Sequence, residues 1–167
     1  MPPKAAADLA PTFTSETPAD ALSVEALLDR AFGPGRFVKV SERVRERALF
    51  RPDFSVCAWV EARLVGAVRM WQVRVAGAPI IFLGPLAVDY ALRTVGLGGQ
   101  LVEDACRRAA AAGFHVVVLV GDEPYFRRFG FSADGTKGLQ LPGPVDQRRV
   151  LARGATTPLV GPVSGGS

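Results

Sequence analysis

The sequence predicts one mixed α/β domain, and three observations lead to this prediction. The chain has 167 residues, which is close to the usual length of a single domain. Residues 54–75 alternate between apolar and polar side chains in the way that half-buried strands do. Over residues 80–120, a strand, a helix and a second apolar strand follow one another, as in a right-handed crossover between parallel strands.

The composition limits the class of protein. Hydrophobic residues make up 49% of the chain and charged residues 22%. A chain of this length buries roughly 70% of its unfolded surface, so it needs no disulfide or structural metal. Cys57 and Cys106 lie far apart, and the single histidine, His115, has no clustered partners, so we expect no metal site. A reducing, cytoplasmic setting is expected.

The charge and the chain ends limit the partners. A formal charge of +4 permits an acidic ligand or a nucleic acid. Six basic residues between Arg36 and Arg51 are interleaved with Glu42 and Glu46 only, and we interpret them as the solvated face of a helix. A nucleic-acid partner would rest on charge alone and is not expected. Residues 1–11 lack the apolar core of a signal peptide, and no apolar run is long enough to span a membrane.

The domain is expected to occupy residues 12–152. Residues 1–11 are rich in alanine and proline, and residues 153–167 are rich in glycine, threonine, proline and serine. Both ends therefore predict loosely ordered tails, the second of them flexible.

Two helices are expected to open the domain. Thr17 and Asp20 are spaced as a capping box, and the helix that follows them ends at Gly33. A second, basic helix is expected to begin at Ser41 and to end near Arg51, because the following proline disfavours helical backbone in the residue before it.

Three strands and a crossover follow. We expect strands at residues 54–60, 64–75 and 80–88, the third apolar on both faces and interrupted at Pro85, which predicts a bulge or a parting from a neighbouring strand. A helix then carries an apolar stripe from Leu97 to Ala112, and a buried strand at residues 116–120 completes the crossover. The remaining expected elements are a short helix from Pro124 to Gly130 and one or two strands between Phe131 and Leu141.

The segment between the third strand and the long helix is rich in glycine. It reads Arg93-Thr94-Val95-Gly96-Leu97-Gly98-Gly99-Gln100. The first N–H groups of a helix lack intrahelical partners and lie at the positive end of its dipole, so this turn predicts a site for a phosphate or pyrophosphate. It is no P-loop, because GxxxxGK[ST] is absent, and no dinucleotide fingerprint, because Leu101 stands where the third glycine is required.

The pattern [QR]-x-x-G-x-[GA] after a strand resembles the acetyl-coenzyme A loop of the GNAT superfamily of N-acetyltransferases. The segments Leu83–Asp89 and Tyr125–Phe131 resemble the family's fourth strand and its closing signature, and the resemblance covers residues 23–150. It implies a mixed sheet of six to seven strands, splayed between strands 4 and 5 and flanked by about four helices. It also implies transfer of an acetyl group from acetyl-CoA directly to a primary amine of a small molecule or peptide.

The resemblance also implies positions for the cofactor. The backbone N–H groups of residues 95–100 would hold the pyrophosphate, with Arg93 at the start of the loop. Leu86 and Val88 would pair with the pantetheine amides as an added strand does, and an N–H near Leu86 would polarise the thioester carbonyl. The full set of expected cofactor contacts is Leu86, Ala87, Val88, Arg93, Thr94, Val95, Gly96, Leu97, Gly98, Gly99, Gln100 and Phe126.

The catalytic groups are less well defined. The family's tyrosine, a usual proton donor to the leaving thiolate, falls on Phe126. The candidate donor in this chain is the adjacent Tyr125, which points about 100° away from Phe126 on a helix. Candidates for the general base are Asp122, Glu123 and, through a water molecule, Glu61. The acceptor is expected between residues 32–40 and residues 132–141.

An alternative function is compatible with the same resemblance. The departure at Phe126 and the absence of an acid from the central strand fit a non-catalytic module that binds acyl-CoA. Homodimerisation through the closing hairpin is consistent with the family resemblance, but no residue in this chain decides it.

Overall fold

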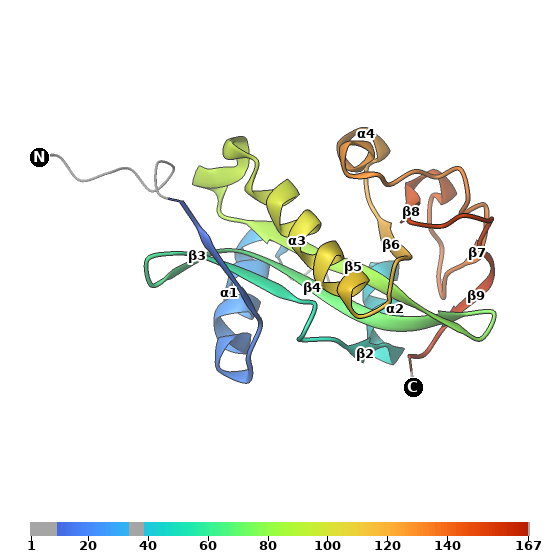
Figure 1. Cartoon of the computed structure of the whole chain (residues 1–167), viewed down its shortest axis with the longest axis horizontal. Helices are drawn as coiled ribbons and strands as arrows, with labels where there is room; N and C mark the ends of the chain where they lie inside the picture. The colour runs from blue at the N-terminus through green and yellow to red at the C-terminus, as the bar shows by residue number, and fades with distance from the viewer. Residues whose placement is uncertain (1–9, 34–38, 167) are drawn as a thin grey trace, which may run out of the picture.

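The computed structural model of the chain describes residues 10–33 and 39–166. It has a mixed sheet with helices on both faces (Figure 1). The strands are β1 Thr12–Ser15, β2 Leu49–Phe50, β3 Val56–Val60, β4 Arg63–Val75, β5 Ala78–Val88, β6 Val117–Val120, β7 Gly138–Gln140, β8 Val150–Arg153 and β9 Val160–Ser164. The α-helices are α1 Ala21–Phe32, α2 Val40–Arg47, α3 Leu97–Ala111 and α4 Glu123–Phe126. The 3-10 turns are η2 Pro18–Asp20, η4 Tyr90–Val95, η5 Arg127–Phe129 and η6 Gln147–Arg149.

The strand order confirms the predicted mixed α/β fold. The main path through the sheet is β1-β3-β4-β5-β6-β8, with β2 and β9 on β4 and β7 on β9. β5 and β6 run parallel and are joined through α3, as the crossover predicts, whereas β3, β4 and β5 pair antiparallel. The described sheet has nine strands instead of six to seven, because several short strands extend it at its margins.

The C-terminal segment is the clearest correction to the expected domain boundaries. Residues 153–167 were expected to form a flexible tail, but Val160–Ser164 is strand β9, which pairs with β4 through Arg74 and Val75 and runs parallel to β7. Backbone hydrogen bonds to distant strands hold this segment in spite of its glycine and proline content. Most of the expected N-terminal tail, residues 1–9, lies outside the described residues.

The two N-terminal helices show one confirmed and one corrected boundary. The backbone N–H of Thr17 donates to the Asp20 carboxylate at 2.9 Å, which confirms the capping box. The basic helix α2 ends at Arg47, before the expected end near Arg51. Leu49 and Phe50 leave it to form β2 against β4, where the ring of Phe50 lies 4.9 Å from that of Trp71.

Apolar side chains fill both faces of the sheet. α3 covers one face, and α1 and α2 lie on the other (Figure 1). The core under α3 includes Leu97, Leu101 and Ala105, all at most 1% exposed, and α1 contributes Val24 and Leu28 to the opposite side. No helix among the described residues is long and apolar enough to cross a membrane.

The central strands diverge where Pro85 interrupts the pattern. Val68 pairs with Leu86 and Met70 pairs with Leu83, so Gly84 and Pro85 together face a single residue of β4. This is the predicted bulge. β5 pairs with β6 only through Ile81 and Phe82, while β6 continues along β8. The splay between these two strands, the fourth and fifth of the expected fold, is confirmed.

Candidate active site

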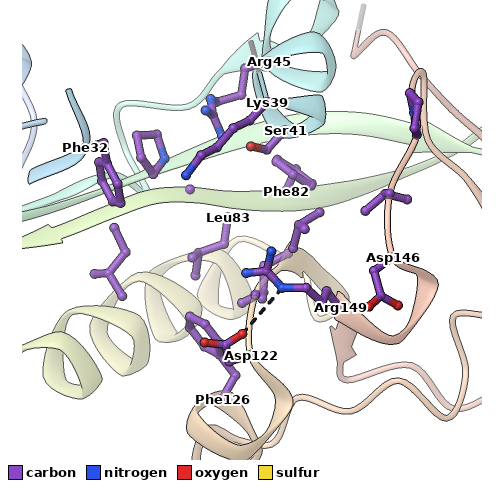
Figure 2. Close-up of a pocket in the computed structure, with 18 residues that line it drawn as sticks. Phe32, Lys39, Ser41, Arg45, Phe82, Leu83, Asp122, Phe126, Asp146 and Arg149 are labelled. Atoms are coloured by element: carbon purple, nitrogen blue, oxygen red, sulfur yellow. Dashed lines mark ion pairs between the residues drawn. The ribbon is translucent and has the colours of Figure 1, made fainter. Parts of the chain in front are cut away.

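A cavity of about 570 Å³ lies where β5 and β6 diverge (Figure 2). This volume is in the range of small-molecule binding sites. β5 and the end of β6 line it in the middle, the region of α1 and α2 lines one side, and the segment before β8 lines the other. The lining residues are Phe32, Lys39, Ser41, Arg45, Phe82, Leu83, Gly84, Pro85, Leu86, Leu119, Val120, Gly121, Asp122, Phe126, Pro144, Val145, Asp146 and Arg149.

The divergence leaves one edge of β5 open to a ligand. In an antiparallel pair, successive residues direct their backbone groups alternately toward and away from the partner strand. Asp89 donates its N–H to Val65 of β4 at 2.7 Å, so Ala87 also faces β4, whereas Leu86 and Val88 direct their backbone groups away from it. The two residues expected to pair with pantetheine therefore present their N–H and C=O groups on the side where β6 has departed.

The glycine-rich loop lies beyond the end of this edge. Residues 93–95 belong to the 3-10 turn η4, and Gly96 has φ +81°, a left-handed conformation that favours glycine. The Gln100 N–H donates to the Gly96 carbonyl at 3.2 Å, which is the first hydrogen bond of α3. The N–H groups of Leu97, Gly98 and Gly99 come before it in the chain and lie at the positive end of the helix dipole. The side chain of Leu97 is buried in the core, so its contribution to a ligand site is restricted to its backbone.

Gly98 and Gly99 allow aromatic side chains to approach α3. A Cβ atom added to Gly98 would lie 2.6 Å from the Tyr125 hydroxyl, and one added to Gly99 would lie 2.6 Å from the ring of Phe129. The rings of Tyr125 and Phe129 also contact each other, 5.5 Å apart. The close packing of α4 and η5 against α3 thus explains why both positions are glycine, and the sequence did not reveal this explanation.

Tyr125 and Phe126 point to different places. Tyr125 lies against the start of α3 and is not among the residues that line the cavity. Phe126 lines the cavity and packs so closely on Gly121 that an added Cβ there would lie 2.5 Å from its ring. An aromatic ring without a hydroxyl therefore occupies the position nearest the diverging strands.

The three expected bases have different surroundings. Asp122 lines the cavity, its side chain is 76% exposed, and its Oδ1 lies 3.5 Å from Nε of Arg149. Glu123 accepts a hydrogen bond from the Ala133 N–H at 2.6 Å and also pairs with Arg127. Both contacts lower the pKa of Glu123, and the hydrogen bond from Ala133 has the larger effect. That carboxylate joins α4 to the segment after it. Glu61 lies in the exposed turn between β3 and β4 and does not line the cavity.

Two groups of lining residues were not predicted from the sequence. Arg45 belongs to the basic stretch that we interpreted as a solvated face, yet it lines the cavity; its side chain is only 7% exposed and pairs with Glu42 at 2.9 Å. The opposite side comes from Pro144–Arg149 and not from the expected residues 132–141. Of the other expected acceptor segment, residues 32–40, Phe32 and Lys39 line the cavity as expected, and residues 34–38 lie outside the described residues.

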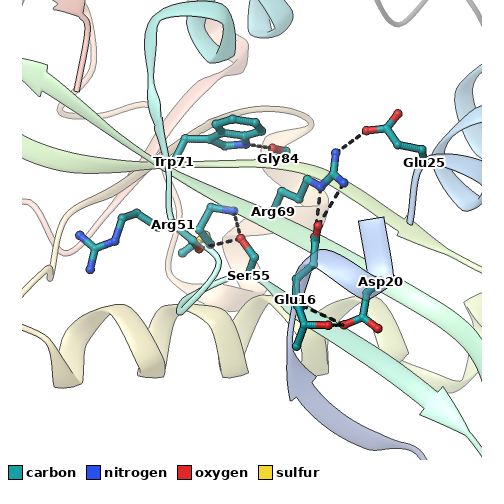
Figure 3. A network of polar contacts seen from close by, with 10 residues as sticks. Glu16, Asp20, Glu25, Arg51, Ser55, Arg69, Trp71 and Gly84 are labelled. Atoms are coloured by element: carbon teal, nitrogen blue, oxygen red, sulfur yellow. Dashed lines mark hydrogen bonds and ion pairs between the residues drawn. The ribbon is translucent and has the colours of Figure 1, made fainter. Parts of the chain in front are cut away.

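A polar network around Arg69 and Trp71 of β4 faces the bulge of β5 (Figure 3). Arg69, the residue opposite the bulge, pairs with Glu16 at 3.1 Å and with Glu25 at 2.5 Å. The indole N–H of Trp71 donates to the Gly84 carbonyl at 2.7 Å. These contacts join β1, α1, β4 and β5 and hold the bulge in place.

Neither cysteine is placed to act as a nucleophile. Both are buried free thiols, and neither lines the cavity. Burial is the main cause that raises the pKa of Cys57 to about 12 and that of Cys106 to about 11. In the part of the chain that the structure describes, no three His, Cys, Asp or Glu residues are grouped as metal ligands.

Comparison with known proteins identifies the family. The family model for the acetyltransferase (GNAT) family matches residues 21–131. The chain is 34% identical, over 118 residues and 70% of each protein, to the uncharacterized N-acetyltransferase YhbS of Escherichia coli K12, and 28% identical over 141 residues to YjhQ of the same strain, covering 81% of this chain and 78% of YjhQ.

Solved structures agree with these sequence matches. The structure of E. coli YhbS in complex with CoA superposes with a TM-score of 0.76 at 27% identity, over 94% of this chain and 90% of YhbS. A Brucella melitensis GNAT acetyltransferase in complex with acetyl-CoA has the same fold, with a TM-score of 0.70 at 24% identity over 93% and 95% of the two chains. The splayed sheet, the glycine loop and these matches together show that the chain belongs to the GNAT family of acetyltransferases.

Proposed function

We propose that the protein transfers an acetyl group from acetyl-CoA directly to a primary amine while both substrates are bound. The observation that carries this proposal is the open edge of β5, which leads from the glycine loop to a cavity at the splay. An extended chain with amide groups can pair along such an edge as an added strand does.

The geometry fits the cofactor in two places. The N–H groups at the start of α3 and the positive end of its dipole suit a pyrophosphate, and the outward backbone groups of Leu86 and Val88 suit the pantetheine amides. The CoA bound to the structurally similar YhbS supports the same assignment here. When bound, acetyl-CoA supplies the acetyl group as an activated thioester.

Asp122 is the proposed general base. An alkylammonium has a pKa near 10.4, so removing its proton at pH 7 costs about 5 kcal/mol, and a positioned base contributes roughly 10²–10⁴ in rate. Of the two carboxylates that line the cavity, Asp146 is held more closely, by the Arg148 side chain at 2.9 Å and its backbone N–H at 3.0 Å, than Asp122 is by Arg149 at 3.5 Å. Asp122 lies at the end of β6 beside the splay, where an acceptor amine would enter.

The chain has fewer groups that could stabilise the leaving thiolate than groups that could bind the cofactor. We propose that the Leu86 N–H donates to the thioester oxygen and stabilises the charge that develops there. Phe126 can donate no proton, and Tyr125 lies against Gly98, so we assign the Tyr125 hydroxyl to cofactor binding instead of proton donation. Thiols ionise near pH 8.5, so a thiolate can leave without a neighbouring acid, at a slower rate.

The state of the thiols supports direct transfer. A covalent acyl-enzyme needs a reactive nucleophile beside the thioester, and the raised pKa and burial of Cys57 and Cys106 exclude them from this role. We propose that the amine attacks the thioester itself.

Calorimetric titration of the protein with acetyl-CoA and with free CoA, followed by thiol release with a panel of primary amines, tests this function. Micromolar binding and amine-dependent thiol release are the expected results. Binding without turnover would favour the non-catalytic acyl-CoA module, which the phenylalanine at position 126 makes the main alternative. No binding would overturn both.

A further inference from the structure

We infer that the acceptor amine also carries an acidic group, such as a carboxylate, which the cavity holds with cationic side chains. This inference rests on the proposed function, because it concerns the acceptor end of the same site. Its basis is the placement of Lys39, Arg45 and Arg149, three cations from two separate parts of the chain that line one cavity.

The three cations approach the cavity from opposite sides. Figure 2 shows Lys39 and Arg45 on the side of α2, and Arg149 across the cavity beside Asp122. Arg45 lies close to the central strand β5: its Nη1 is so near Gly84 that a Cβ atom added there would be 3.5 Å away. An anion that enters between these side chains would meet positive charge on both sides.

The carboxylates nearby balance this charge only in part. Glu42 pairs with Arg45 and is not among the lining residues, and Asp146 is engaged by Arg148. Asp122 and Arg149 are 3.5 Å apart, which is longer than a charge-assisted hydrogen bond of about 2.7–2.9 Å. Three cations and two carboxylates line the cavity, so it favours an acceptor whose amine is accompanied by an acid over one that carries only positive charges, such as a polyamine.

The position of Asp122 gives the acceptor a direction. Its carboxylate at the end of β6 takes the amine, and the acidic group of the acceptor then reaches toward Arg149 and Lys39. Apolar side chains also line the cavity, including Phe32, Leu83 and Val145, and favour an acceptor with an apolar part. An amino acid or a short peptide with a free carboxylate has all three features.

A pair of product analogues tests the acid preference without catalysis. We would titrate N-acetyl-L-phenylalanine and its neutral carboxamide into the CoA-loaded protein and into the protein alone. The carboxylate should bind at least about tenfold more tightly, because a hydrogen bond to a charged group contributes about 1.5–3 kcal/mol. Arg149→Gln and Lys39→Gln, both at exposed positions, should each reduce this ratio severalfold.

Arg107→Gln is the matched control. It removes the same charge from an arginine of α3 whose side chain is 76% exposed and does not line the cavity, so the ratio should not change. Equal affinity for the two analogues, or no binding of either, would overturn the inference. Failure of the proposed function would look different, because CoA binding would then be absent while the acid preference, measured on the protein alone, could persist.

Discussion

Replacing Gly96 with glutamate tests whether the glycine loop holds the pyrophosphate. Gly96 has φ +81°, and a Cβ atom there would meet no other atom within 4 Å, so the new side chain has room. A left-handed conformation costs a non-glycine residue about 1–2 kcal/mol, which a domain with about 5–15 kcal/mol of stability tolerates. The variant should therefore fold.

The expected loss of affinity comes from charge. A carboxylate about 5 Å from a phosphate, at an effective dielectric constant of about 20, raises the energy of the complex by about 3 kcal/mol. The dissociation constant for CoA should increase at least about 100-fold. Calorimetric titration of CoA into the wild type and the variant measures this change, and the melting temperature of each protein reports on the fold.

Two controls separate charge from backbone strain. Gly96→Ala has the same φ penalty without the charge and should keep CoA affinity within about fivefold. Gly113→Glu places the same charge on a glycine with φ +93° and no neighbour within 4 Å, but at the other end of α3, about 25 Å away and beyond the screening length. Wild-type affinity in Gly96→Glu, within about threefold, would refute the assignment of this loop to the pyrophosphate.

Four further predictions concern single side chains. Asp122→Asn should lower kcat/KM for the amine by about 10²–10⁴ without changing CoA affinity, as steady-state kinetics and calorimetry would show. Tyr125→Phe should raise KM for acetyl-CoA severalfold and leave kcat within about threefold, because the hydroxyl lies at the start of α3 and outside the cavity. Cys106 in the native protein at pH 8 should react with a thiol reagent at least about 100-fold more slowly than in denaturant, because burial raises its pKa to about 11. Arg69→Ala should lower the free energy of unfolding in urea by about 3–5 kcal/mol, because it leaves the carboxylate of Glu16, only 4% exposed, without this partner.

Each of these predictions has a distinct contrary result. Unchanged turnover in Asp122→Asn would place the base elsewhere, and a loss of kcat above about 10²-fold in Tyr125→Phe would restore its role as proton donor. Rapid labelling of native Cys106 would show an accessible thiolate. For Arg69, the control is Arg107→Ala, whose side chain is 76% exposed and should change stability by less than about 1 kcal/mol; an equally small effect at Arg69 would mean that Glu16 is solvated.

The central part of the fold could be predicted because its signals are local and strong. Alternating side chains marked β4, an apolar run marked β6, and the proline in β5 marked a bulge that the register shift confirms. The capping box of Thr17 and Asp20 is likewise a contact within one turn. Each of these features depends on residues that are neighbours in the sequence.

The margins of the sheet could not be predicted in this way. β9 contains glycine and proline, and it forms a strand because it pairs with β4, about 90 residues earlier in the chain. β2 has two residues, too few for any periodicity to be visible, and its pairing with β4 shortens the basic helix before it. Long-range backbone pairing decided these elements, and a single sequence does not display it.

The glycine loop and the share of residues 32–40 in the cavity lining could be predicted from the sequence, whereas Arg45 and Pro144–Arg149 could not. The glycine loop is one continuous motif, whereas the cavity combines Lys39 and Arg45 with Arg149, more than 100 residues later. The density of basic residues around α2 was the available signal, but charge alone does not distinguish a solvated helix face from a cavity wall. The close approach of Tyr125 and Phe129 to the glycines of α3 was also invisible before the helices were placed.

The most direct test of the central claim is the initial rate of thiol release, measured while acetyl-CoA and a carboxylate-bearing primary amine are both varied. Direct transfer within a ternary complex predicts double-reciprocal lines that intersect, and an unmodified protein mass after incubation with acetyl-CoA alone. Parallel lines together with a protein mass increased by one acetyl group would contradict the account, and so would the absence of thiol release with every amine tried.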